Sequence, residues 1–306
     1  MPAFKSRARL CLLPTALIAT LALASPAAAA EGSISYLPGV SAGTPVGALP
    51  PVGVYFNGNF YFLSGELADG DGEHVPVKGS ARAVIAQVTW STPLRILGAR
   101  YGAGVIQIVA DHSFDTRGVG GRKTRSVGLY NTVVQPVILS WQIGKDLHAS
   151  FSQNIYVNDG ARKTTGGVRD QDSYANNYWT FEPSVGISYI PKGWNLTAYV
   201  LYDLATTKNK KTDYKVGNIF YVDLTATHQS GKFVYGLVGT ATQQVTDDRL
   251  HGVAVPGGNR SSHIQAGPLL SYNFPKFSVT AKYFANLHAR NDLSASIGYL
   301  SIATKF

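Results

Sequence analysis

The chain has 306 residues, of which 45% are hydrophobic and only 15% are charged, and its formal net charge is +9 at pH 7. Its single cysteine, Cys11, lies close to the N-terminus, so a chain processed beyond it can have neither disulfides nor cysteine-bound metal. After residue 30 no apolar stretch approaches the roughly 18 residues that a membrane-spanning helix needs. The basic residues are scattered through loops and form no stripe on a helix, which excludes nucleic acid as an expected partner.

The first thirty residues have the pattern of a secretory signal peptide. Basic residues Lys5, Arg7 and Arg9 precede an apolar run from residue 10 to residue 23, and small residues at 28–30 provide a cleavage site. The apolar run is too short and wrongly flanked for the alternative, an uncleaved membrane anchor. Cleavage lowers the net charge to +6, because three basic residues and no acidic residue are removed. We therefore expect an exported chain.

Residues 31–51 contain glycine and proline throughout and show no periodicity. This composition predicts a flexible N-terminal arm rather than a helix or a strand. Two roles remain open for it. It is either a disordered periplasmic tail or a plug that folds into the interior of the domain that follows.

From residue 52 to residue 306 apolar and polar residues alternate, which places them on opposite faces of β-strands. Between residues 177 and 190, for example, Val185 and Ile187 share one parity and Ser184 and Ser188 share the other. A closed barrel pairs every backbone group between strands, so we predict an all-β fold, a transmembrane antiparallel up-and-down β-barrel of about 12 strands. The expected strands are residues 52–64, 79–92, 100–112, 130–143, 147–157, 177–190, 194–206, 215–229, 233–246, 262–274, 277–288 and 294–306.

Long and short connections alternate between these strands, as in barrels with short periplasmic turns and longer extracellular loops. An even number of strands places both ends of the barrel in the periplasm. Phe306 closes an amphipathic last strand and is expected to be the signal that the outer-membrane assembly machinery recognises. The long connections expected are residues 65–78, 113–129, 158–176, 207–214 and 247–261, whereas residues 289–293 are a short exception.

Three prolines, Pro136, Pro183 and Pro268, fall inside expected strands. Proline cannot donate a hydrogen bond to a neighbouring strand, so we expect bulges or local breaks at these positions.

Charged and polar residues on the strand face opposite the apolar residues are expected inside the barrel, because a charge that faces lipid costs up to about 2–4 kcal/mol at mid-membrane. Two interpretations remain open. These residues line a passage and select solutes, or they form a structural network that fills a narrow barrel. The candidates are Glu182, Asp203, Tyr221, Asp223, Thr225 and Lys282.

Catalytic and metal-binding patterns are weak. Asp111, His112 and Ser113 are adjacent, but neighbours on a strand point to opposite faces and do not converge on one site. Asp247 and Asp248, beside a Gly-Gly-Asn run, offer oxygen ligands for a cation, although a solvated acidic loop explains them better. We therefore expect no enzyme, no cofactor and no metal site.

Several segments resemble the "meta-pathway of phenol degradation" family of exported proteins. They are residues 50–55, 134–141, 177–183, 212–217, 243–248 and 266–268, which occur in order along the chain. The resemblance implies an outer-membrane barrel related in style to long-chain fatty-acid and aromatic-hydrocarbon channels. It supplies no catalytic residues, and its motif candidates are Trp179, Phe181, Asp213, Gln243, Thr246, Asp247 and Asp248.

The expected function is a channel in the bacterial outer membrane that takes up small hydrophobic or aromatic compounds. The expected partners are outer-membrane lipid, lipopolysaccharide and the solute itself. Two alternatives stay open, an outer-membrane lipid-modifying enzyme and a structural barrel with a filled lumen.

Overall fold

The computed structural model describes residues 35–160, 162–165, 178–205, 207–209 and 212–306. The expected signal peptide, residues 1–30, lies outside the described residues, as do the first four residues of the expected arm.

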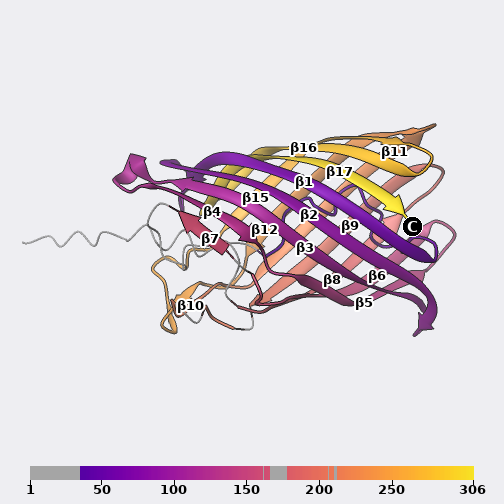
Figure 1. Cartoon of the computed structure of the whole chain (residues 1–306), viewed down its shortest axis with the longest axis horizontal. Coiled ribbons are helices and arrows are strands. Elements are labelled where there is room, and N and C mark those ends of the chain that lie inside the picture. Colours follow the sequence, from indigo (N-terminus) through magenta and orange to yellow (C-terminus); the bar gives the residue numbers. More distant parts are fainter. Residues whose placement is uncertain (1–34, 161, 166–177, 206, 210–211) are drawn as a thin grey trace, which may run out of the picture.

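Twelve antiparallel strands form a closed barrel, with strands that run obliquely around it (Figure 1). The ring closes because β1 pairs with β17 on one side and with β2 on the other, and β2 continues to β3. The predicted twelve-stranded barrel is therefore confirmed. The strands of the ring are β1 (Gly53–Ala68), β2 (His74–Ile96), β3 (Ala99–Asp115), β5 (Val133–Gln142), β6 (Leu147–Tyr156), β8 (Thr180–Tyr189), β9 (Trp194–Ala205), β11 (Ile219–Ser230), β12 (Phe233–Gln244), β15 (Ser262–Asn273), β16 (Phe277–Arg290) and β17 (Asp292–Lys305).

The connections define two ends, which we call the turn end, with the short turns, and the loop end, with the long connections. The expected loop 113–129 was wrong for most of its length. There β3 continues to Asp115, a 3-10 turn η2 (Arg117–Val119) follows, and β4 (Lys123–Leu129) returns along β3. Alternation misses this hairpin because most of its side chains between His112 and Ser126 are polar, whereas the exposed apolar residues Val127 and Leu129 come at the end of β4. β4 pairs in turn with β7 (Arg162–Thr165).

A second, small sheet lies at the loop end. It consists of β10 (Tyr214–Lys215), β13 (Arg249–Leu250) and β14 (Val253–Ala254). It belongs to the two connections that join β9 to β11 and β12 to β15. The expected strand 215–229 therefore begins later, at Ile219.

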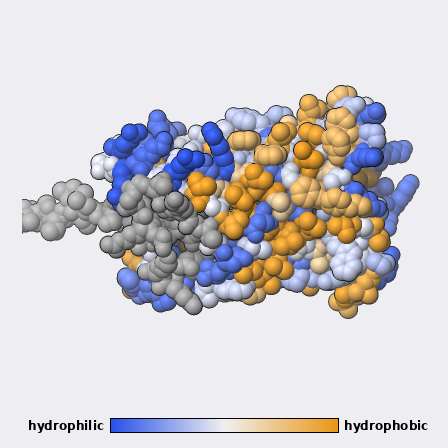
Figure 2. Space-filling model, in the orientation of Figure 1, coloured by the Kyte–Doolittle hydropathy of each residue, from blue (hydrophilic) through white to orange (hydrophobic). Residues whose placement is uncertain are grey.

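The side chains that point outward from the strands form an apolar band around the barrel. Val185, Ile187 and Leu237 are exposed on the outside, whereas Ser184 and Ser188 are buried inside. Figure 2 shows hydrophobic residues gathered across the middle of this face, with hydrophilic residues toward both ends. Such a band is the surface that a transmembrane barrel presents to lipid. Among the described residues no helix is both long enough and apolar enough to cross a membrane.

The three mid-strand prolines disturb the pairing as predicted. At Pro136 the register of β5 against β6 shifts between Val134 and Val137. β8 and β9 lack pairing over the two positions that include Pro183, and β15 and β16 lack it over the two that include Pro268. In each case the missing amide donor explains the break.

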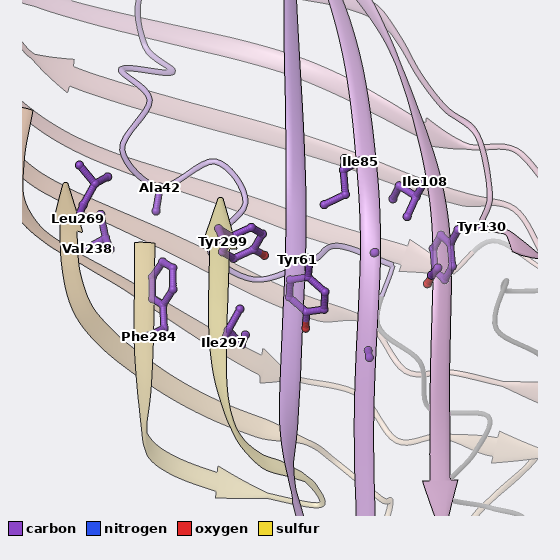
Figure 3. Packing of buried hydrophobic residues seen from close by; sticks show 13 residues of the cluster. Ala42, Tyr61, Ile85, Ile108, Tyr130, Val238, Leu269, Phe284, Ile297 and Tyr299 are labelled. Atoms are coloured by element: carbon purple, nitrogen blue, oxygen red, sulfur yellow. The ribbon is translucent and has the colours of Figure 1, made fainter. Parts of the chain in front are cut away.

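Much of the interior is packed with side chains (Figure 3). The Tyr61 and Tyr299 rings lie 5.2 Å apart, and the Phe284 ring lies 6.1 Å from Tyr299. Ala42 is buried in the same cluster, although it precedes the first strand. The barrel is therefore closed by packing over part of its length.

Candidate solute site

Residues 35–51 lie inside the barrel, where Tyr36, Ala42 and Leu49 are buried. We call these residues the inner segment. Wall side chains on β5, β8, β11 and β16 hydrogen-bond to it, so it contacts the ring from several sides. The inner segment therefore occupies the lumen.

Consecutive turns allow the inner segment to fold in this small space. The amide of Val40 donates to the Leu37 carbonyl at 3.1 Å, and further turns follow along the segment. Gly39 and Gly43 have φ angles of 80° and 94°, a backbone conformation that residues other than glycine rarely adopt. A Cβ on Gly39 would also stand 2.6 Å from the Phe284 ring, so glycine is needed there for space as well.

Lys282 and Asp223 hold the first half of the inner segment. The Lys282 ammonium donates to the carbonyl oxygens of Gly39, Val40 and Ala42 at 2.8, 3.0 and 2.9 Å. The Asp223 carboxylate accepts from the Tyr36 hydroxyl at 2.6 Å and from the Gly39 amide at 3.0 Å. Both buried charges are therefore satisfied by the segment rather than by each other.

Neutral hydroxyls hold the second half. Thr225 Oγ1 accepts from the Gly43 amide at 2.8 Å, and Ser188 Oγ accepts from the Gly47 amide at 2.9 Å. Ser140 Oγ donates to the Gly47 carbonyl at 2.8 Å. These wall residues all point inward, so the barrel wall supplies the hydrogen bonds that an irregular buried segment requires.

A cavity of about 580 Å³ lies between the inner segment and one side of the wall, and it reaches the turn end. Most of its lining is aliphatic or aromatic, and the rest consists of amide and hydroxyl side chains with Lys276 and Lys305. Its lining includes Leu37, Val40, Val46, Leu49, Ile85, Gln87, Ile106, Ile108, Val133, Gln135, Ile138, Asn154, Tyr156, Tyr199, Phe274 and Phe277.

The amides form a connected polar line across the cavity wall. Gln87 donates to Gln135 at 3.1 Å, Gln135 donates to Asn154 at 2.8 Å, and Asn154 donates to Glu182 at 2.6 Å. The four residues come from β2, β5, β6 and β8. The cavity therefore combines an apolar surface with a fixed set of hydrogen-bonding groups.

A second, more polar cavity of about 360 Å³ lies on the other side of the inner segment. Asn59, Asn195 and Lys282 contribute to its lining. Val40, Thr44 and Pro45 line both cavities. Asn57, Asn273, Ser278 and Ala303 of the wall also line both, so a mainly apolar cavity and a more polar one adjoin at the turn end.

The six side chains expected to line a pore are all buried inside the barrel. Of the six, Lys282 lines a lumen cavity, whereas Asp223 and Thr225 are occupied by the inner segment. Tyr221 donates to Asp203 at 3.3 Å, and Glu182 accepts from Asn154. The sequence analysis missed the residues of the apolar cavity. Gln87 and Asn154 could have been found, because they occupy inward-facing positions of the alternating pattern.

The family-motif candidates lie outside the cavities. Trp179 and Phe181 are exposed on the outer wall, whereas Gln243 lies at the loop end of β12 and Thr246 follows two residues after that strand ends. Asp248 is buried and accepts hydrogen bonds from Tyr214 Oη, Gly217 N, Gln244 Nε2 and Asn259 Nδ2 at 2.5, 2.8, 2.7 and 2.8 Å. The expectation of a solvated acidic loop is wrong for Asp248, because it is buried and accepts from the end of β12 and from both connections.

Asp213 and Asp247 pair with basic residues at the loop end. Asp247 accepts from Arg260 at 2.7 Å. Lys208 and, to a lesser degree, His251 bond to the Asp213 carboxyl and hold its pKa below its usual value. Neither carboxylate is therefore placed as a cation ligand, and no group of three or more His, Asp or Glu in the described part of the chain could hold a metal ion.

The neighbours of two histidines, His112 and His288, have other partners. Asp111 is paired with Arg125 at 2.7 Å, and Ser113 bonds to Ser80 at 3.1 Å. At the loop end, Ser262 bonds to His288 at 3.3 Å, whereas the carboxylate of Asp292 bonds to a different imidazole. At the loop end the serine and the carboxylate thus contact different histidines.

A closed barrel with an apolar outer band and a segment folded into its lumen defines the class of bacterial outer-membrane β-barrels. The chain belongs to the family described as "putative MetA-pathway of phenol degradation", whose model matches residues 64–299. The fold is similar to that of an outer membrane channel from Pseudomonas putida F1, with 12% identity, a TM-score of 0.71, and 85% of this chain and 97% of that chain covered.

Two further solved structures are less similar. A mutant of the monoaromatic hydrocarbon channel TodX has 11% identity and a TM-score of 0.44, with 84% of this chain and 91% of that chain covered. The monoaromatic hydrocarbon channel CymD has 9% identity and a TM-score of 0.43, with 86% and 91% covered. No curated protein matches the sequence.

Proposed function

We propose that this protein is an outer-membrane channel that takes up small hydrophobic or aromatic compounds, and that the 580 Å³ cavity is its solute site. The observation that carries the proposal is the chemistry of that cavity. Its volume falls within the range of about 300–1,000 Å³ that is usual for small-molecule sites. Tyr156 and Tyr199 offer aromatic faces, while Gln87 and Gln135 fix polar substituents.

The comparisons support this proposal. The family description names a pathway of phenol degradation, and the Pseudomonas protein that shares the fold is called an outer membrane channel. Aromatic compounds cross lipopolysaccharide slowly, and a cavity reached from the turn end gives them a site inside the barrel.

The inner segment is the gate of this channel in our proposal. Its first residues pack with Tyr178, Tyr214 and Tyr221 toward the loop end, and both cavities lie toward the turn end, so a solute that crosses the barrel must displace the segment. Its anchors are individual hydrogen bonds from the wall rather than a continuous strand ladder. A segment held in this way can be displaced without unfolding the barrel.

The proposal also covers the partners of the barrel in the outer membrane. The apolar band contacts outer-membrane lipid, and the polar loop end contacts lipopolysaccharide. Phe306, whose surface is 78% exposed, is available to the assembly machinery.

Uptake of labelled compounds by cells with and without the protein tests the proposal. The panel contains phenol, benzoate, toluene and a long-chain fatty acid. We expect the protein to accelerate entry of the aromatic compounds. Equal entry of every compound in both cell types would contradict the channel function.

Two alternatives are weaker. A lipid-modifying enzyme needs one histidine that contacts both a serine and a carboxylate, and the recorded bonds divide these partners between two histidines. A filled structural barrel needs its inward charges paired with one another, whereas Lys282 and Asp223 bind the inner segment. We therefore propose a channel rather than an enzyme or a filled structural barrel.

A further inference from the structure

The hairpin of β16 and β17 is unpaired near the loop end. The two strands pair from Phe277 with Thr304 to Phe284 with Ile297. Both strands continue beyond that point, but in this part of the described chain residues 285–290 and 292–296 have no pairing with each other. We call this region the hairpin gap.

Side chains from inside the barrel replace part of the missing ladder. Gln265 Nε2 donates to the Ala295 carbonyl at 2.6 Å, and Asn286 Nδ2 donates to Ser294 Oγ at 2.9 Å. His263 Nδ1 lies 3.2 Å from Asp292 Oδ2. The hairpin gap is thus bridged by polar side chains of β15 and β16.

Four buried polar atoms beside the hairpin gap have no hydrogen-bond partner within the described ranges. They are Thr242 Oγ1, His263 Nε2, Gln265 Oε1 and Asn286 Oδ1. Thr242 is directly opposite His263 on β12 and β15, and Gln265 is directly opposite Asn286 on β15 and β16. Residues paired in this way have Cβ atoms roughly 5 Å apart. His263 and Gln265 are alternate residues on the same face of β15, about 7 Å apart, so the two pairs are neighbours.

The hydrogen bonds already made decide what the cluster can bind. A carboxylate can only accept, so His263 Nδ1 is the donor to Asp292, and in the tautomer with its proton on Nδ1 the Nε2 atom is an acceptor. The amide nitrogens of Gln265 and Asn286 are in use, which leaves their oxygens as acceptors. Three acceptors and one hydroxyl disfavour an anion and require a donor. Because buried polar groups are almost always hydrogen-bonded, such a cluster calls for an occupant.

We infer that Thr242, His263, Gln265 and Asn286 form a buried binding station for O–H donors, separate from the apolar cavity at the turn end. Two sources supply this chemistry, ordered water and the hydroxyl group of a solute. The solute source rests on the proposed function, because the solute must first enter the barrel. In that case the station distinguishes hydroxylated aromatic compounds from plain hydrocarbons.

Magnetic resonance of the purified full barrel in detergent micelles tests the station directly. The histidine rings are labelled with nitrogen-15, and His263→Gln identifies the His263 signal. The ligands are phenol and anisole, which share a ring and an oxygen but differ in the O–H donor. We expect phenol, and not anisole, to shift the Nε2 signal of His263. If the occupant is water, ring-to-water contacts appear and neither ligand shifts the signal.

Two matched variants separate the station from general effects on the barrel. Thr242→Val keeps the shape of the side chain and removes the hydroxyl, so we expect phenol affinity to fall about five- to tenfold. Thr227→Val is the control, because Thr227 on β11 is also buried with an unpartnered hydroxyl in the described chain but lies toward the turn end. Equal losses in both variants would overturn the role of Thr242.

A His263 ring with neither water contacts nor a response to phenol would overturn the station. That result is distinct from failure of the proposed function, which cell uptake reports. Uptake of phenol without any response of the His263 signal would support the channel function and contradict the station. A His263 response without uptake in cells would support the station and contradict the channel function.

Discussion

At the scale of single residues, Lys282 has the largest number of bonds to the inner segment. We predict that Lys282→Met, which keeps most of the side-chain stem, destabilises the seated segment by about 2–5 kcal/mol, because three charge-assisted bonds disappear and Asp223 loses a neighbouring charge. Hydrogen exchange of the Gly39 amide measures this. Lys232→Met, in an exposed turn, is the matched control, and equal protection in both variants would show that Lys282 does not hold the segment.

Gly47 tests the other half of the inner segment. A Cβ at this position would stand 2.7 Å from the Ser188 amide nitrogen and 2.8 Å from the His148 carbonyl oxygen. Both atoms belong to backbone in the wall and cannot move easily, so we predict that Gly47→Ala lifts the segment from β6 and β8.

Limited proteolysis reports that displacement, since a lifted segment is cut faster. Gly144→Ala is the control, because the nearest atom to its Cβ would be 3.9 Å away. Cleavage at the wild-type rate in Gly47→Ala would mean that the contact is not tight.

The inward direction of the candidate residues could be predicted from sequence, but their partners could not. Alternation and the cost of charge in lipid place Glu182, Asp223 and Lys282 inside. Their partners include residues of the inner segment, which are more than 180 positions away from Asp223 and 240 or more from Lys282. No local pattern reports a contact between an irregular segment and a distant strand, so the cavities remained invisible to sequence.

At the scale of elements, Asp248 joins the two long connections that carry β10, β13 and β14. We predict that Asp248→Asn loosens this small sheet by about 1–3 kcal/mol, because an amide nitrogen then faces buried donors. Faster hydrogen exchange at the Gly217 amide measures the change, with the barrel strands unaffected.

Asp247→Asn is the comparison for that variant. Asp247 is 38% exposed in its ion pair with Arg260, and pairs of this kind contribute about 0–1 kcal/mol. Similar exchange rates in the two variants would show that burial of Asp248 has no special role.

The elements themselves were predictable where they cross the membrane and not beyond it. Lipid on one side and a lumen on the other impose alternation on β8 and β9, and both were located within a few residues. β4 is a real strand, but it lies outside the alternating pattern with Lys123 and Arg125 exposed. A strand whose exposed face begins with charged residues instead of an apolar row leaves no such trace in the sequence.

At the scale of the whole molecule, transport requires a path from the loop end to the turn end, and the inner segment occupies the lumen on that path. A reversible cross-link can test whether it must move. Val46 Cγ2 lies 2.9 Å from the position that a Cβ on Gly186 would take, a separation that a disulfide can span. Cys11 lies in the expected signal peptide, so Val46→Cys with Gly186→Cys introduces the only thiols of the processed chain.

We predict that the oxidised double variant takes up aromatic solutes no faster than cells without the protein, and that reduction restores uptake. The segment is then fixed to β8 in the first state and free to leave it in the second. Gly186→Cys alone controls for crowding against Ser150 Oγ, which would lie 2.7 Å from the new Cβ. If a verified cross-link leaves uptake unchanged, solutes pass without displacing the segment, and the gate must lie elsewhere in the barrel.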